Sequence, residues 1–376
     1  MTLNWLLASR REAVRTDVFE RRLRRYHPRF RGAVHAQAMR HARIADLAAS
    51  FPALLFALAV PRPAFDPARA LACVIDGRSL AEAAAAADLP FWLRKLPPEA
   101  FAGPIAKLPD GELFRRQIAN HFPRSPKLAP TWLRVVTDVA SLAHEPAALW
   151  IARELVREPR RVNPARLRLI SLWAWFSVQS VTFGHELIRR PWTPDMGMAA
   201  ALTAADDWIT MIALHVNLGH EPIADMWLRA GQLAGYDFVP LDSVSAIIEE
   251  ADAMRNCLRT YGANLAHNRS RLWSIRQNGE RLATLRIGCQ HRDPLPNIIE
   301  LEGAGNTKAP RELWWAARQW LQTHDLLQIN TGQRRWGTTP LDRAAWLSLW
   351  RPYWLAKRRI PEWLPIAPSR KALQAL

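Results

Sequence analysis

Cys257 and Tyr261 are four residues apart, a spacing that places two side chains on one face of a helix. A cysteine reacts as its thiolate, which needs a neighbouring base or a positive environment. Arg255, Arg259 and His267 lie close by in the sequence and could supply it. The alternative is a small buried cysteine that packs beneath a sheet. The pair is therefore a candidate for a nucleophilic site, with core packing as the competing interpretation.

Glu300 and Asn306 extend this candidate site into the following segment. Asn306 comes after two glycines, so it either forms a turn with a positive φ angle or presents its amide to a ligand. Together with Cys257 and Tyr261, these residues could surround the cleft of an enzyme that acts on nucleic acid or a nucleotide. The sequence contains no phosphate-binding glycine loop, dinucleotide fingerprint or zinc-protease spacing after His185. We therefore expect no metal and no cofactor, and the catalytic role stays open.

A predicted hairpin, "LWSIRQNGERLATLRIG" at residues 272–288, is rich in arginine. The Asn-Gly pair in its middle is typical of a type I′ turn, because both turn positions need a positive φ angle. A two-residue turn places Arg276 opposite Arg281. The same register places Arg271 opposite Arg286.

Like charges that face each other across a β-ladder are unfavourable, so these pairs require a negative partner. One candidate is internal, because Glu300 and Glu302 share a face of the predicted third strand. The other is an external phosphate held between two guanidinium groups. We expect a phosphate, and hence nucleic-acid binding, at Arg276 and Arg281, which flank an exposed turn. For the deeper pair we expect the carboxylates.

The C-terminal segment alternates tryptophan with basic residues. Aromatic rings beside cations suit base stacking combined with phosphate contact. The same pattern suits an amphipathic helix docked on a core, and Trp350 and Trp354 keep helical spacing. We expect the tryptophans to pack on the core, which leaves Lys357, Arg358 and Arg359 to contact nucleic acid.

The net charge of +17 is concentrated at the two ends of the chain. Residues 1–50 carry eleven Arg against four acidic residues, and residues 331–376 carry nine Lys or Arg against two. Such a distribution favours a polyanionic partner, because each neutralised phosphate releases counterions. The alternative is a composition effect, since Arg outnumbers Lys almost everywhere in the chain. Nucleic acid is the partner that we expect.

The elements that must position these residues fall into three regions. Residues 1–235 read as short helices separated by prolines, with an arginine-rich start. Residues 236–330 predict a helix, the hairpin, a third strand and a second helix. Residues 331–376 are expected to form a basic, tryptophan-rich helical tail. The expected fold class is α+β: a mostly α-helical N-terminal region, then a small module with a three-stranded antiparallel sheet, then the tail.

Several motifs of the middle region occur together over about residues 245–325. A helix carries Met-x-x-Cys with Tyr four residues later, the hairpin carries Ala-Thr-Leu, and a strand leads into Gly-x-x-Asn. The residues are Met254, Cys257, Tyr261, Ala283, Thr284, Leu285, Gly303 and Asn306. In the order and spacing of these motifs the segment resembles the PcfJ-like domain of conjugative plasmids and other mobile elements. This chain has Arg255 and Asn256 where the family often has a histidine, and Glu300 where it often has glutamine.

The resemblance implies an association with bacterial DNA transfer. The leading hypothesis is a PcfJ-like accessory protein of a mobile or conjugative element that binds DNA or a protein–DNA assembly, with proteins of a DNA-transfer complex as possible partners. The alternatives are the enzyme described above and a protein-interaction scaffold. No apolar run reaches the roughly 18 residues of a membrane span, the first residues lack an export signal, and the three cysteines are far apart. We therefore expect a cytoplasmic location.

Overall fold

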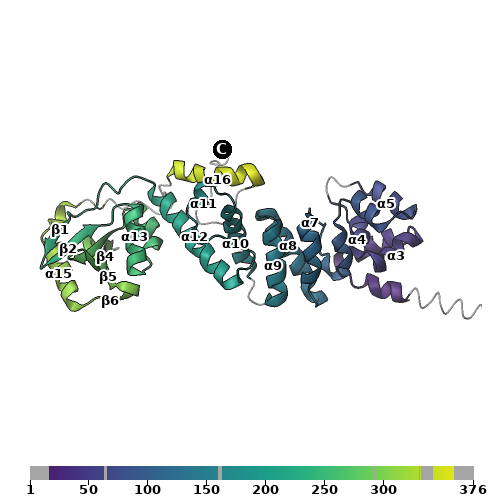
Figure 1. Ribbon diagram of the computed structural model, residues 1–376, viewed down its shortest axis with the longest axis horizontal. Helices are drawn as coiled ribbons and strands as arrows, with labels where there is room; N and C mark the ends of the chain where they lie inside the picture. Colours follow the sequence, from purple (N-terminus) through teal and green to yellow (C-terminus); the bar gives the residue numbers. More distant parts are fainter. Residues whose placement is uncertain are drawn as a thin grey trace, which may run out of the picture. The chain divides into compact units, whose positions relative to one another are not determined.

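A computed structural model describes residues 17–62, 66–159, 163–290, 293–329, 331 and 342–359 (Figure 1). Contacts between Cα atoms divide the chain into two compact units. Unit 1 comprises residues 1–178 and 191–203, and unit 2 comprises residues 179–190 and 204–376. Residues 1–16, 332–341 and 360–376, which carry part of the predicted basic charge, lie outside the described residues.

Unit 1 is built from short helices. Their bounds are α2 Arg31–Ala38, α3 Ala42–Ser50, α4 Pro52–Ala59, α5 Pro67–Ile75, α6 Leu80–Ala86, α7 Glu112–Gln117, α8 Ala129–Leu142, α9 Glu145–Arg157 and α10 Pro164–Ser177. Proline opens α4, α5 and α10, because its fixed φ angle suits the first helical position and its missing N–H would have no partner there.

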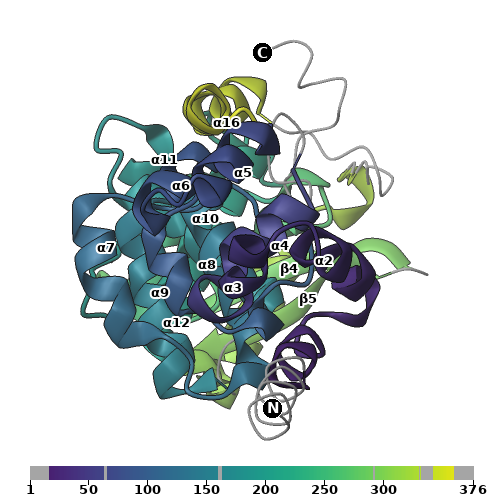
Figure 2. The same ribbon diagram turned by 90° about the vertical axis from the view of Figure 1, so that its right-hand side faces the viewer.

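The core of unit 1 contains α4, in which every residue from Pro52 to Leu58 is buried. The helices α2, α3 and α4 contact one another and group together in Figure 2. Phe56 of α4 packs its ring near those of Tyr26 and Phe101, with centroids 6.2 and 5.6 Å away. Further along the chain α8 packs against α9, and Trp132 and Trp150 are buried there. Apolar burial around these helices therefore organises unit 1.

Unit 2 joins helices to a single sheet. Its helical elements are α11 Phe183–Glu186, α12 Met198–Leu218 from residue 204 onward, α13 Val244–Met254, the 3-10 turn η7 Leu258–Tyr261, α14 Gly262–Ala266, α15 Arg311–Gln322 and α16 Arg343–Lys357. Its strands are β1 Gly231–Leu233, β2 Tyr236–Pro240, β3 Ser270–Gln277, β4 Glu280–Gln290, β5 Asp293–Gly303 and β6 Thr307–Lys308. All neighbouring strands are antiparallel, and their order in the sheet is their order in the chain.

The prediction of a three-stranded sheet was therefore wrong, because the described sheet has six strands. The α+β class itself agrees with the structure. The strands that were missed are short, and β6 has only two residues, both exposed. Such segments have too few residues for the alternation of apolar and polar residues that signals a strand to be recognised. They join the sheet through backbone pairing: β2 pairs with β3, β1 pairs with β2, and β6 pairs with β5.

The hairpin between β3 and β4 has a bulge that shifts its register. Arg276 lies opposite Arg281, as predicted, but Ile275 then pairs with Ala283. Beyond that point Arg271 lies opposite Ile287, so its predicted pairing with Arg286 was wrong. The bulge places the apolar residues of both strands on the same face of the sheet. Burial of that face favours the bulged register over the register without a bulge that the turn alone predicts.

A helix covers each face of this sheet (Figure 1). On one face α15 buries Leu313, Ala317 and Trp320 against strand residues that include Trp273 and Leu285. On the other, α13 buries Ile247 and Ala251 in a cluster with Leu272 of β3. Because side chains alternate along a strand, Leu272 and Trp273 point to opposite faces. Polar residues on the α13 face must therefore find partners beneath that helix.

Candidate functional site

Glu250 is a fully buried carboxylate on the face of α13 that meets the sheet. It accepts a hydrogen bond from Arg281 Nε at 2.8 Å and another from the Thr284 hydroxyl at 3.2 Å. Arg276 forms a longer ion pair with it, at 3.8 Å. The two facing arginines of the hairpin thus share one internal counter-charge, since a buried carboxylate is stable only when it is paired and hydrogen-bonded.

The residue that neutralises Arg276 and Arg281 was not among the sequence candidates, which were Glu300, Glu302 and an external phosphate. A signal for it exists in the sequence. Ile247, Glu250, Ala251 and Met254 follow helical spacing and are all buried. An acidic residue inside an apolar stripe requires a cationic partner from the element below, and here that element is the arginine-rich hairpin.

Tyr261 and Arg286 meet at Glu300 on the same face of the sheet. The Tyr261 hydroxyl donates to Glu300 Oε2 at 2.5 Å, and Arg286 donates to Oε1 of the same carboxylate at 3.1 Å. The Arg286 guanidinium also lies over the Tyr261 ring, 4.5 Å from its centroid. This confirms the expectation that Arg286 pairs with a carboxylate of the third predicted strand. The same expectation for Arg271 was wrong, because Arg271 donates to the carbonyl oxygen of Asp225 and to the side chain of Asn268.

Two contacts fix Tyr261 in this position. Arg259, in the same turn η7, forms ion pairs with Asp207 of α12 and with Asp252 of α13, the latter at 2.6 Å. Gly262 follows directly, and an added Cβ there would lie 3.1 Å from the Leu214 Cα, so glycine lets the two backbones approach closely without displacing α12. The turn that carries Tyr261 is therefore anchored to two helices.

Burial raises the pKa of Tyr261, and the hydrogen bond to Glu300 raises this pKa further. The negative charge of Glu300 acts in the same direction, while the positive charge of Arg286 lowers this pKa. The phenol therefore stays protonated and acts as a donor. With both carboxylate oxygens of Glu300 engaged, the arrangement clamps η7 to β4 and β5, and it offers no tyrosinate nucleophile.

The structure separates the remaining catalytic candidates. Cys257 is exposed, so the alternative of a small buried cysteine was wrong. It does not share a regular helix face with Tyr261, because α13 ends at Met254 and Arg255 takes a left-handed conformation. Asn306 is exposed with a φ angle of 57°, directly after a glycine with positive φ, as expected of a turn residue. Of the four candidates, only Tyr261 and Glu300 are hydrogen-bonded to each other.

The helix α16 carries the basic residues predicted at the C-terminal end. Its side chains Trp346, Trp350 and Tyr353 are buried, and Trp354 is partly buried. The expected docking of the tryptophans therefore agrees fully with Trp346 and Trp350 and in part with Trp354. Arg358 is exposed and ends the helix in a left-handed conformation, and Arg359 follows it. Lys357 is only half-buried, and burial, followed by the charge of Arg359, lowers its pKa.

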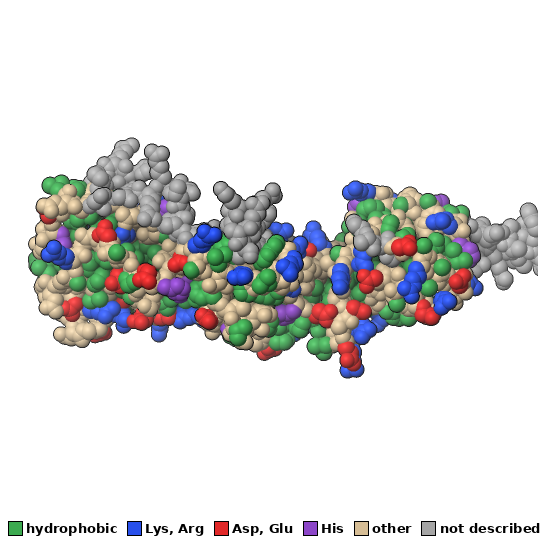
Figure 3. All heavy atoms as spheres, turned by 90° about the horizontal axis from the view of Figure 1, so that it is seen from above, with side chains coloured by type: hydrophobic (Ala, Val, Ile, Leu, Met, Phe, Trp, Pro, Cys, Tyr) green, Lys and Arg blue, Asp and Glu red, His purple; other side chains and the backbone are tan. Residues whose placement is uncertain are grey.

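The outward stripe of α16 is more extended than the sequence predicted. Arg343, Arg351 and Arg358 are spaced at eight and seven residues, all are exposed, and residues 343–359 include no Asp or Glu. Figure 3, which looks down on α16, shows Lys and Arg side chains beside apolar ones along this helix. We call these three residues the α16 stripe. Arg343 and Arg351 are eight residues apart within α16 and so share a helix face, whereas Arg358 follows the last residue of the helix.

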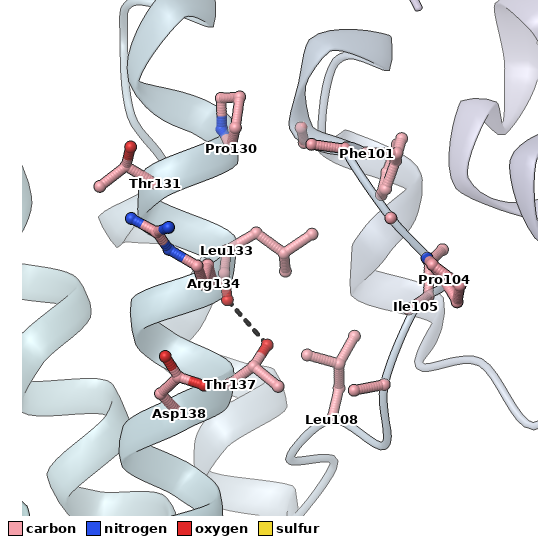
Figure 4. A pocket seen from close by; sticks show the side chains of 14 residues that line it. Phe101, Pro104, Ile105, Leu108, Pro130, Thr131, Leu133, Arg134, Thr137 and Asp138 are labelled. Carbon is pink, nitrogen blue, oxygen red and sulfur yellow. Dashed lines mark hydrogen bonds between the residues drawn. The ribbon is translucent and has the colours of Figure 1, made fainter. Parts of the chain in front are cut away.

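Unit 1 contains a separate pocket between residues 101–108 and α8 (Figure 4). Its volume is about 460 Å³, and Phe101, Ile105 and Leu133 supply much of the lining. Arg134 and Asp138 stand on the α8 side, and the Thr137 hydroxyl donates to a carbonyl of its own helix. Most of the residues that line the pocket are apolar.

Among the described residues, no group of three His, Cys, Asp or Glu side chains could hold a metal ion. Within the same residues, no helix is both long and apolar enough to cross a bilayer. Comparisons of the chain with family models, with curated proteins and with solved structures found no match.

Proposed function

We propose that this protein is a PcfJ-like accessory protein of a mobile or conjugative element, and that it binds DNA or a protein–DNA assembly through arginine. The motifs of residues 245–325 support the first part of the proposal. The α16 stripe is the single observation that carries the second part. Exposed arginines at the start and in the middle of α16, followed by Arg358 directly after its last residue, suit the regularly spaced phosphates of a nucleic acid.

Helix stability alone does not account for the α16 stripe. Cations near a helix C-terminus stabilise the helix dipole, which explains Lys357 and Arg358 without a ligand. Arg343, however, is the first residue of α16, where a positive charge meets the positive end of the dipole. Arg351 lies in the middle of the helix, where the dipole has little effect. An anion outside the protein accounts for all three positions at once.

The proposal is tested with two variants that have the same net charge, of which only one lacks the α16 stripe. In one variant Arg343, Arg351 and Arg358 become glutamine. In the control Arg21, Arg115 and Arg116 become glutamine. These control residues are also exposed, but each forms an ion pair with a carboxylate, at 4.0 Å or less. Both variants lose three positive charges, so only the position of the charge differs.

Binding to a duplex DNA probe is then measured over a series of salt concentrations. We expect the stripe variant to lower the slope of log K against log salt by about 2 to 3, because each phosphate contact contributes about 0.9. The control should change the slope by less than half as much. Equal losses in both variants would show that general charge, not the stripe, drives binding. A wild-type protein that binds no DNA at low salt would favour the scaffold alternative.

A further inference from the structure

Trp315 is the one exposed tryptophan of the described residues, with 58% of its surface accessible. Its neighbours on α15 show why it is not part of the core. Leu313, Ala316 and Trp320 are buried against the sheet, whereas Trp315 follows the opposite side of the helix. A large apolar ring that is exposed to water forgoes the favourable free energy of its burial. A ligand that covers the indole would recover that energy.

Two arginines flank this indole on the same helix face. Arg311, Trp315, Arg318 and Gln322 are spaced at four, three and four residues, and all four are exposed. No ion pair joins Arg311 or Arg318 to any carboxylate in the part of the chain that the structure describes. The Arg318 guanidinium lies 5.7 Å from the centroid of the Trp314 ring, a contact that restricts its orientation.

We propose that this surface, the α15 stripe, binds single-stranded nucleic acid, an inference that rests on the proposed function. A base stacks on the indole of Trp315, and Arg311 and Arg318 contact the phosphates on either side. An aromatic ring between cations suits a single strand, because every unpaired base offers a flat face for stacking. In a duplex the base faces stack on one another, so contacts go mainly to phosphates and groove edges.

One acidic residue lies beside the α15 stripe. Glu312 is exposed in the first turn of α15, where it is favourable to the helix dipole. It is three residues from Trp315, so it repels a phosphate that approaches the indole. The charge of this surface therefore stays positive, with two arginines against one carboxylate, but the acid weakens it. Glu312→Gln should strengthen binding of a single strand.

The experiment measures fluorescence polarisation of a labelled dT oligonucleotide of about 12 nucleotides and of a duplex probe of the same length. Trp315→Ala should weaken binding of the single strand about 10- to 100-fold, because one stacked base is lost. Binding of the duplex should not change, and Trp315→Phe should retain most of the affinity. Val181→Ala removes another exposed apolar side chain of unit 2, 95% accessible, and serves as the control.

The outcomes separate the two proposals. Unchanged single-strand binding by Trp315→Ala would overturn the α15 stripe and assign the indole to a protein partner instead, even if the α16 variant loses its duplex binding. An equal loss for both probes would also overturn it, because stacking on one indole distinguishes single strands from duplexes. A wild-type protein that binds neither probe at low salt would overturn this inference together with the proposed function. Thermal unfolding of each variant shows whether the fold is retained.

Discussion

The hairpin of β3 and β4 and the helix α16 are both rich in arginine, but they differ in what neutralises the charge. Arg276 and Arg281 meet the buried carboxylate of Glu250, and Arg286 meets Glu300. The α16 stripe has no acidic residue between positions 343 and 359. Glu250 lies 31 residues before Arg281 in the chain, so only the fold brings them together. The number of arginines in a segment therefore does not locate an anion site, because distant carboxylates decide which of them are available.

The largest expected effect comes from Glu250, which joins α13 to the hairpin. Glu250→Gln keeps the shape of the side chain but leaves two facing arginines without their counter-charge. We expect the free energy of unfolding to fall by about 3 kcal/mol, at the lower end for a broken buried pair because the arginines are partly exposed. Urea denaturation measures the change. Glu249→Gln, at the adjacent exposed position, should alter stability by less than about 0.5 kcal/mol.

Tyr261 should contribute less than Glu250, because its hydrogen bond lies partly in solvent. Tyr261→Phe removes the donor to Glu300 but keeps the ring beneath Arg286. A hydrogen bond to a charged acceptor contributes about 1.5–3 kcal/mol when buried, and partial exposure reduces the expected loss to about 1 kcal/mol. Denaturation of the variant at neutral pH gives the value. A variant as stable as the wild type would show that the clamp on η7 holds without this bond.

Alkaline pH tests the same residue. The folded protein holds Tyr261 in its neutral form, since burial and Glu300 raise its pKa. Its contribution is complete below the ordinary tyrosine pKa of about 10 and is lost as the pH rises toward the folded value. Stability should therefore decline less steeply above pH 10 in Tyr261→Phe than in the wild type. Tyr26 and Tyr353, whose pKa values burial also raises, remain in both proteins and set the common background.

The smallest effect is expected for Arg276. Arg276→Ala removes an ion pair of 3.8 Å, but Arg281 keeps its hydrogen bond to Glu250 at 2.8 Å. We expect a loss of less than about 1 kcal/mol in unfolding free energy and no change in oligonucleotide affinity. Paired measurements of unfolding and of binding to the duplex probe decide the matter. Weaker binding with unchanged stability would show that Arg276 contacts the nucleic acid, and that the hairpin, like α16, binds an external anion.

Local signals in the sequence predicted several elements correctly. Asn278 and Gly279 do have positive φ angles, and they form the turn between β3 and β4. The helix after Pro310 and the burial of the α16 tryptophans follow from apolar residues at helical spacing. These features depend on neighbours within one or two turns of the chain, which a sequence displays directly.

Features that depend on distant partners were missed. The bulge after Ile275 reflects a choice between two registers that only the buried face of the sheet makes. Arg255 ends α13 in a left-handed conformation, which composition rarely signals outside glycine and asparagine. Tertiary packing, not propensity, assigns each of these residues to its role.

The strand order of unit 2 has a consequence for how the unit folds. Each strand pairs with its neighbour in the chain, so most of the sheet needs only short loop closures, and such contacts form early. The exception is the connection from β2 to β3, which contains α13 and η7. We therefore expect the hairpin of β3 and β4 to form before α13 docks, while Arg276 and Arg281 still face each other without Glu250. On this expectation Glu250→Gln should mainly speed unfolding and leave the folding rate almost unchanged, which stopped-flow kinetics in urea would measure.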